Sequence, residues 1–283
     1  VLYLATSVAA AKGIAPVHQI IKTASGIGDA NVHTRLPMPE HKDELFQLAA
    51  TINALLNRIE SRIKREKQFT ADASHELRTP LAAIRGTLEV LARRPREPAH
   101  YEEKIAEVIR EVDRMNRILS QLLQLSRLEA GQAAFSQEPI NLLRLVQELM
   151  PQWQPELDRK QIEVIANIPP EAGLTADPSS LRLMADNLAA NAIKYGRRHG
   201  RINISWRPEE RALSIADDGP GIAAEHLPFL FDRFYRADAS RNSRIPGTGL
   251  GLSIVKKLAD LQGIRIELSS SEGEGTTITL FFP

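Results

Sequence analysis

The chain has 283 residues, of which 43% are hydrophobic and 25% are charged, a composition typical of a folded, mostly soluble chain and not of a disordered one. Lys and Arg number 36 and Asp and Glu number 35, so the balance of charge gives no general drive toward nucleic acid. There is no Cys, which excludes disulfides, thiol nucleophiles and Cys-ligated zinc or iron–sulfur sites.

The first eleven residues, VLYLATSVAAA, are uncharged, and Lys12 follows them. A membrane-spanning helix needs about 20 apolar residues, so this stretch is too short to span a bilayer alone. Two interpretations stay open. The stretch is the start of an ordinary apolar helix, or it is the end of a truncated transmembrane helix with Lys12 on the cytoplasmic side.

A shorter amphipathic stretch begins at Pro16 and leads into a connector that contains Gly26 and Gly28. Residues 40–79 contain neither Gly nor Pro, so they are predicted to run as one helix, roughly 60 Å long. The stretch 12–61 is therefore predicted to form a helix, a connector and a second helix.

Two apolar seams at alternating spacings of three and four predict long helices that need partner helices. The prolines of RRPREPAH (93–100) separate the two seams. Two antiparallel helices alone bury such seams poorly, whereas a dimer that forms a four-helix bundle buries them well. The seam residues are Leu45, Leu48, Ile52, Leu55, Ile59, Ala73, Leu77, Leu81, Ile84, Leu88 and Leu91, then Ile105, Val108, Val112, Met115, Leu119 and Leu122.

The pattern changes near residue 130. Apolar residues alternate in RINISW, ALSIA, IRIEL and TTITLFF, which predicts strands over 201–206, 212–216, 264–268 and 276–282. Helical patterns cover 141–152 and 179–195. This mixture predicts an α/β sandwich in which helices cover one face of a sheet.

The stretch DNLAANAIKYG places Asn187 and Asn191 four residues apart, on one face of a helix, with Lys194 and Tyr195 one turn later. Amide oxygens suit Mg²⁺, Lys suits phosphate, and a Tyr ring can flank a base. The alternative is a pair of surface Asn residues with a solvated Lys.

In ADDGPGI, Asp217 ends a predicted strand, and Gly219 and Gly221 follow it. A carboxylate at this place can accept a hydrogen bond from an exocyclic amine, and the glycines allow a ligand close to the backbone. The alternative is an ordinary tight turn.

In PGTGLGLSIVKKLA, Gly247, Gly249 and Gly251 precede an amphipathic helix, where backbone N–H groups can bind an anion. The spacing is G-x-G-x-G and an Arg-rich loop precedes it, which argues against a dinucleotide fold, and no P-loop motif is present.

In FLFDRFYRAD, Phe231 and Phe234 can anchor a lid and Arg236 can reach phosphate. The alternative for this run is a helix that packs in the core.

The stretch SHELRTP places a carboxylate, Glu76, beside His75, and Pro80 follows. His75 lies off the apolar seam and is expected to face solvent, where neutral imidazole is a good nucleophile near pH 7. Pro80 has no N–H, so the Glu76 carbonyl loses its helical partner and the helix is expected to bend beside His75. A zinc protease motif would need a second His at the position of Thr79.

Taken in order, these clusters resemble the H, N, G1, F and G2 boxes of histidine kinases, and SEGEGTTI (271–278) resembles their G3 box. Residues 12–61, with Pro16 and Asp43-Glu44, resemble a HAMP linker. Two places depart from the usual pattern, Leu261-Gln262-Gly263-Ile264 and Gly196, and neither touches a residue to which we assign chemistry.

The resemblance implies an all-α HAMP linker and a dimeric four-helix-bundle hairpin, followed by an α/β sandwich ATP-binding domain. The expected divisions are 1–11 for the possible end of a transmembrane helix, 12–61 for the HAMP linker, 62–130 for the dimerisation and phosphotransfer domain, and 131–283 for the catalytic domain. It implies a homodimer in the bacterial inner membrane, with the portion seen here cytoplasmic, that binds a response regulator and no nucleic acid.

The implied reaction is autophosphorylation of His75 by ATP, with Glu76 as base, and transfer to an aspartate of a receiver domain. Thr79 is expected to help hydrolyse the phosphorylated partner. In the ATP site, Asn191 is expected to bind Mg²⁺ with support from Asn187. The implied nucleotide-binding residues are Asn187, Asn191, Lys194, Tyr195, Asp217, Gly219, Gly221, Arg236, Gly247, Thr248, Gly249, Leu250, Gly251 and Thr276.

Two other functions compete with this one. A coiled-coil signalling scaffold would bind nucleotide only to change shape, and the intact His75 and Glu76 argue against it. An ATPase of the gyrase or Hsp90 type would share the nucleotide fold but would lack a phospho-acceptor hairpin.

Overall fold

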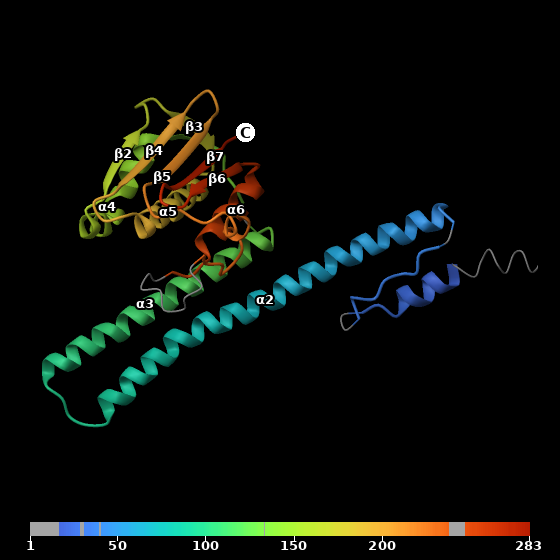
Figure 1. The fold of residues 1–283 in the computed structure, drawn as a ribbon, viewed down its shortest axis with the longest axis horizontal. Coiled ribbons are helices and arrows are strands. Elements are labelled where there is room, and N and C mark those ends of the chain that lie inside the picture. The colour runs from blue at the N-terminus through green and yellow to red at the C-terminus, as the bar shows by residue number, and fades with distance from the viewer. Residues whose placement is uncertain (1–16, 29–30, 40, 133, 238–246) are drawn as a thin grey trace, which may run out of the picture. The chain divides into compact units, whose positions relative to one another are not determined.

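The computed structural model describes residues 17–28, 31–39, 41–132, 134–237 and 247–283 (Figure 1). The chain divides into two compact units, Val1–Ser74 and His75–Pro283. The expected end of a transmembrane helix at 1–11, Pro16 of the HAMP-like stretch and the Arg-rich loop before Gly247 lie outside the described residues. None of the helices that the structure describes is both long enough and apolar enough to cross a lipid bilayer.

The first unit has a small core of its own. A helix covers 17–25, an extended connector follows, and a second helix begins at Glu44. Ile20 from the first helix, Leu36 from the connector and Ala49 from the second helix are buried together. The predicted order of helix, connector and helix is therefore confirmed.

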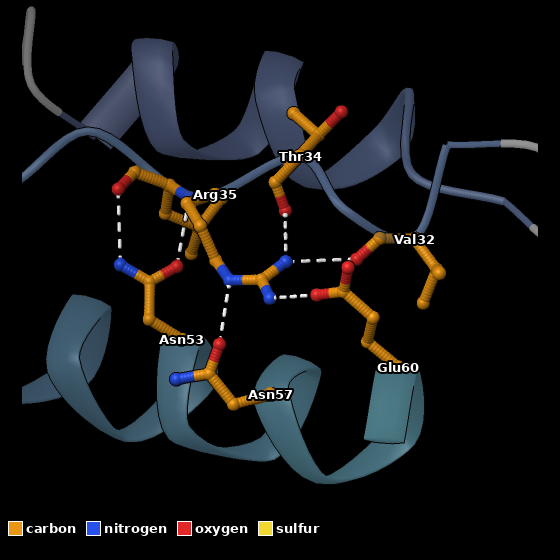
Figure 2. Close-up of polar contacts among 7 residues, drawn as sticks. Val32, Thr34, Arg35, Asn53, Asn57 and Glu60 are labelled. Carbon is orange, nitrogen blue, oxygen red and sulfur yellow. Dashed lines mark hydrogen bonds and ion pairs between the residues drawn. The ribbon is translucent and has the colours of Figure 1, made fainter. Parts of the chain in front are cut away.

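A polar cluster around Arg35 fastens the connector to the second helix (Figure 2). The Arg35 guanidinium donates to the carbonyls of Val32 at 2.8 Å and Thr34 at 3.1 Å. It also donates to Asn57 Oδ1 at 2.8 Å and forms an ion pair with Glu60. One side chain thus joins the connector backbone to the helix.

Asn53, one turn before Asn57, completes this cluster by pairing with the backbone of Leu36. Asn53 Oδ1 accepts from the Leu36 N–H at 2.8 Å, and Asn53 Nδ2 donates to the Leu36 carbonyl at 3.0 Å. The amide side chain therefore takes the place of a neighbouring strand and satisfies both backbone groups of Leu36.

The long helix α2 spans Glu44–Ala92. It begins four residues later than the predicted start at 40, because Asp43 Oδ1 accepts from the N–H groups of Leu45 and Phe46, both at 3.1 Å, and so caps the first turn. Pro80 does not end the helix, in line with the apolar seam predicted through Leu91. α2 continues through this buried proline for twelve more residues, because the apolar seam continues on both sides.

Helix α3 spans Pro98–Glu129 and has Pro at its first turn, where no N–H partner is lost. In the second unit, α3 runs back along α2 after the turn at 93–97 (Figure 1). Large apolar side chains stay exposed on the two helices, as expected for a seam that needs a partner. They are Leu81, Leu88, Val90, Ile105, Ile109, Val112, Leu119 and Leu123.

The rest of the second unit is an α/β sandwich with a mixed sheet of order β2-β4-β5-β7-β6. β2 pairs in parallel with β4, and the other pairs are antiparallel. The four predicted strands are confirmed as β4 (Arg201–Arg207), β5 (Ala212–Asp217), β6 (Arg265–Ser271) and β7 (Gly275–Phe281). The sequence missed β2 (Glu163–Asn167) and the separate pair β1 (Glu138–Asn141) and β3 (Gly173–Ala176).

Helices α4 (Leu142–Lys160), α5 (Pro178–Tyr195) and α6 (Gly251–Gln262) form one layer beside this sheet (Figure 1). α5 packs on β5, and α6 packs on β6. α4 extends beyond its predicted end at 152 and contains Pro151 and Pro155. The helix considered as an alternative for FLFDRFYRAD does not form, since this segment holds only the end of a short 3-10 turn, Leu227–Phe229.

Candidate active site

A cavity of about 520 Å³ opens between α5, the ends of β5 and β7, and the loop that enters α6. Every predicted nucleotide-binding residue except Gly219 and Leu250 lines it. Gly219 lies directly behind Asp217, and Leu250 is fully buried in the core at the start of α6. The fold thus gathers at one place residues that lie up to 89 positions apart in the sequence, from Asn187 to Thr276.

Asp217 stands at one end of the cavity, on the last residue of β5. The Gly219 N–H donates to Asp217 Oδ1 at 2.9 Å, which fixes the direction of the carboxylate. Burial raises the pKa of Asp217, and the N–H groups of Gly219 and Thr276 partly oppose this shift. Asp217 therefore presents a partly buried, hydrogen-bonded carboxylate at the cavity wall.

Helix α5 carries four of the predicted residues, Asn187, Asn191, Lys194 and Tyr195. Asn187 Nδ2 donates to the Leu183 carbonyl at 2.8 Å, so the side chain is held one turn back along its own helix. Lys194 Nζ donates to the Tyr195 hydroxyl at 2.8 Å and lies 4.4 Å from the centre of that ring. The ammonium group is therefore placed beside an aromatic ring at the mouth of the cavity.

The glycines before α6 allow close approach of neighbouring segments. A Cβ at Gly251 would lie 2.7 Å from Asn187 Oδ1, so only glycine fits without moving that amide. Gly249 has φ +70°, and its carbonyl accepts from the Phe234 N–H at 2.9 Å. The FLFDRFYRAD segment is thereby held against the glycine loop, and Arg236 lines the cavity.

Several residues of the site had no signal in the sequence. Lys160 donates to the carbonyls of Ile193 at 2.8 Å and Lys194 at 2.7 Å, so it caps the end of α5 just where the cavity residues lie. Burial lowers the pKa of Lys160. Two residues of α3, Arg117 and Gln121, also line the cavity. Apolar walls come from Ile215, Leu268 and Ile278, which the strand alternation could have indicated.

The predicted phospho-acceptor residues lie elsewhere, on α2. His75 is exposed, as predicted, and it does not line the cavity. The Thr79 hydroxyl donates to the His75 carbonyl at 3.2 Å. Glu76 forms an ion pair of 3.8 Å with Arg114 of α3, a partner that the sequence did not indicate.

Within the described part of the chain, no group of three or more His, Cys, Asp or Glu side chains is placed to hold a metal ion. The side chains that bring oxygen atoms to the cavity lining include the amides of Asn187 and Asn191 and the carboxylates of Asp217 and Glu272. This set suits an ion that is held largely by the phosphates of a bound nucleotide.

An α/β sandwich whose cavity is lined by the predicted nucleotide-binding residues, joined to a helical hairpin with an exposed His, defines the class of histidine kinases. Three family descriptions match the chain in order: the HAMP domain at 8–61, the His Kinase A (phospho-acceptor) domain at 65–131, and the histidine kinase-, DNA gyrase B- and HSP90-like ATPase at 176–283. The chain belongs to the sensor histidine kinases.

The chain is 33% identical to the sensor histidine kinase YkoH of Bacillus subtilis and 30% identical to the signal transduction histidine-protein kinase BaeS of Escherichia coli. Both matches cover 99% of this chain, and they span 62% and 60% of those relatives. The chain therefore corresponds to about three fifths of their length. A solved structure of the histidine kinase ThkA in complex with the response regulator TrrA shares the fold with a TM-score of 0.63 at 22% identity, covering 80% of this chain and 66% of that one.

Proposed function

We propose that this chain catalyses ATP-dependent phosphorylation of His75 and passes the phosphoryl group to an aspartate of a response-regulator receiver domain. The observation that carries the proposal is the cavity itself. Asp217 offers a buried carboxylate at one end for the amine of adenine, and Lys194 and the Gly247–Gly251 loop offer a cation and close backbone at the other end for phosphates.

The bond changes of this reaction balance with the residues at hand. One ring nitrogen of neutral His75 attacks the γ-phosphorus of ATP, and the bond from that phosphorus to the bridging oxygen breaks, so ADP leaves with the electron pair. The other ring nitrogen gives its proton to the Glu76 carboxylate. Because His75 does not line the cavity, transfer requires the ATP-binding domain to move toward a His75, of this chain or of a second copy.

The test is incubation of the protein with γ-labelled ATP. We expect acid-labile, alkali-stable label on the protein, and none on His75→Gln, while both proteins bind ATP equally. A scaffold would acquire no label, and a gyrase-type ATPase would release only free phosphate. Label that persists on a folded His75→Gln protein would contradict the assignment of His75.

We also propose Mg²⁺ as the metal, with Asn191 as its protein ligand and Asn187 as support. Asn191 lines the cavity on α5, between Asn187 and Lys194, and a single amide ligand fits an ion that keeps most of its contacts to phosphate and water. The metal would neutralise charge on the transferring phosphoryl group.

Dephosphorylation of the partner is a second proposed activity, and Thr79 is its residue. Thr79 is exposed one turn after His75, and its hydroxyl donates to the His75 carbonyl, so it lies beside the phospho-acceptor. Thr79→Ala should lower the rate of phosphatase activity and leave autophosphorylation intact.

We propose the same arrangement for the whole protein as for its relatives. The chain would act as a homodimer through the exposed seam of α2 and α3, with the HAMP region at 12–61 joining it to a membrane anchor. The phosphotransfer domain would cover 62–130, where the family match covers 65–131, and the catalytic domain would cover 131–283, which begins 45 residues before its family match at 176–283.

A further inference from the structure

One face of α3 connects the phospho-acceptor to the nucleotide cavity. Arg114, Arg117 and Gln121 follow each other at spacings of three and four, so they share one side of the helix. Arg114 pairs with Glu76, the neighbour of His75, whereas Arg117 and Gln121 line the cavity. Seven residues of helix separate the first of these contacts from the last, a distance of about 10 Å.

Gln121 shows which end of the cavity α3 closes. The Thr248 hydroxyl donates to Gln121 Oε1 at 2.7 Å and also accepts from the Leu250 N–H at 3.2 Å. Thr248 lies between Gly247, which approaches Lys194, and Gly249. The helix therefore meets the cavity at the glycine loop, which is proposed to bind the phosphates.

Arg117 brings a positive charge to this end. It is exposed, and it forms no ion pair with any of the described residues. A planar guanidinium with several N–H donors suits phosphate oxygens better than any other side chain. The exposed apolar residues of α3, such as Val112 and Leu119, lie roughly on the other side of the helix, so a dimer that buries them leaves Arg117 accessible.

We propose that Arg117 forms part of the phosphate subsite and that Gln121 positions Thr248 beside it, so that the hairpin helix itself completes the nucleotide site. The inference rests on the proposed function, since it takes ATP as the ligand. It adds that a nucleotide with β- and γ-phosphates holds the ATP-binding domain against α3, while one with a single phosphate does so poorly. Arg117 would then recognise how many phosphates the nucleotide carries.

The experiment is calorimetric titration of the intact chain with ATP, ADP and AMP in the presence of Mg²⁺. Arg117→Gln should weaken ATP binding about tenfold and leave AMP binding nearly unchanged, and Arg117→Lys should restore part of the loss. Gln121→Ala should weaken ATP binding by a smaller factor with no change in melting temperature. The matched control is Arg110→Gln, which removes the same charge from an exposed position of α3 that does not line the cavity.

The outcomes separate this inference from the proposed function. If the parent chain binds none of the three nucleotides, the proposed function fails. If the parent binds ATP but Arg117→Gln binds it as tightly as Arg110→Gln does, or loses AMP and ATP equally, only the role of Arg117 is overturned.

Discussion

In the proposed site, Asp217 accepts a hydrogen bond from adenine more strongly when it is ionised, yet burial disfavours its charge. Its pKa is raised by burial, so the folded protein holds the proton more tightly than the unfolded chain does. The ionised carboxylate therefore lowers the free energy of unfolding. This loss of stability is absent below the pKa of Asp217 in the unfolded chain, near about pH 4. It grows as the pH rises through the higher pKa of Asp217 in the folded protein.

We expect Asp217→Asn to raise the melting temperature of the nucleotide-free protein at neutral pH and to abolish tight ATP binding. The gain in melting temperature should shrink toward zero as the pH is lowered to about 4, because Asp217 is then protonated in both states. Calorimetric melting across this pH range measures it, with the exposed Asp260→Asn as control. A lower melting temperature for Asp217→Asn at neutral pH would contradict the argument.

Gly251 and Asn187 also work as a pair. A methyl group at position 251 would meet the Asn187 oxygen at 2.7 Å, and that amide is tied to Leu183. We expect Gly251→Ala to weaken ATP binding tenfold or more, by displacing the amide beside the proposed metal ligand. Gly247→Ala should cost less, because the added methyl meets only the flexible end of Lys194. Titration with ATP ranks the two variants. Equal losses of ATP affinity would contradict a special role for the Asn187 amide.

At the scale of single elements, Pro80 is the unusual feature of α2. Pro80 has no N–H, so the carbonyl of Glu76, the residue after His75, has no helical N–H partner, although the helix continues. We expect Pro80→Ala to stiffen this turn, so that His75 moves less readily toward the nucleotide. The rate of autophosphorylation should fall relative to the rate of phosphatase activity.

Both rates can be measured on the same preparation, with label on the protein and release from a phosphorylated receiver domain. Arg85→Ala is a suitable control, since it changes an exposed residue of the same helix whose ion pair with Glu89 is worth little. A ratio of the two rates that is the same for Pro80→Ala and Arg85→Ala would remove the proposed role of the proline.

The elements also show what the sequence could predict. β4 to β7 carry apolar residues at every second position, as in RINISW, so the local sequence is enough to predict each of these strands. β1, β2 and β3 have four or five residues each, and strands such as EPIN and GLTA are too short to show a period. Most of the cavity lining lies in the contiguous motifs, and twelve of the fourteen predicted nucleotide-binding residues line it. Arg117, Gln121 and Arg114 were not, because only the tertiary fold brings α3 to the glycine loop and to Glu76.

At the scale of the whole molecule, the apolar seam on α2 and α3 is a surface of exposed hydrophobic side chains that lacks a packing partner in the single chain. Leu88 is 48% exposed and Leu119 is 49% exposed, and burying one such side chain is worth about 1.5–3 kcal/mol. In a symmetric dimer each residue counts twice. We expect the parent chain to be a dimer and Leu88→Asp to dissociate it, because a carboxylate would be buried in each protomer.

Sedimentation equilibrium over a range of concentrations tests this expectation. Glu89→Gln changes the adjacent, exposed residue and should leave the dimer intact. A dimer of Leu88→Asp as tight as that of Glu89→Gln would mean that the two chains meet through another surface.

The Arg35 cluster has a consequence for how a mechanical input would travel. The side chains of Arg35 and Asn53 join the connector at 32–36 to three successive turns of α2, at Asn53, Asn57 and Glu60, through three hydrogen bonds and an ion pair. The connector is therefore held to the helix at three places along its axis. A displacement that reaches residues 32–36 must be passed on as motion of the helix backbone itself, and that same uninterrupted helix carries His75.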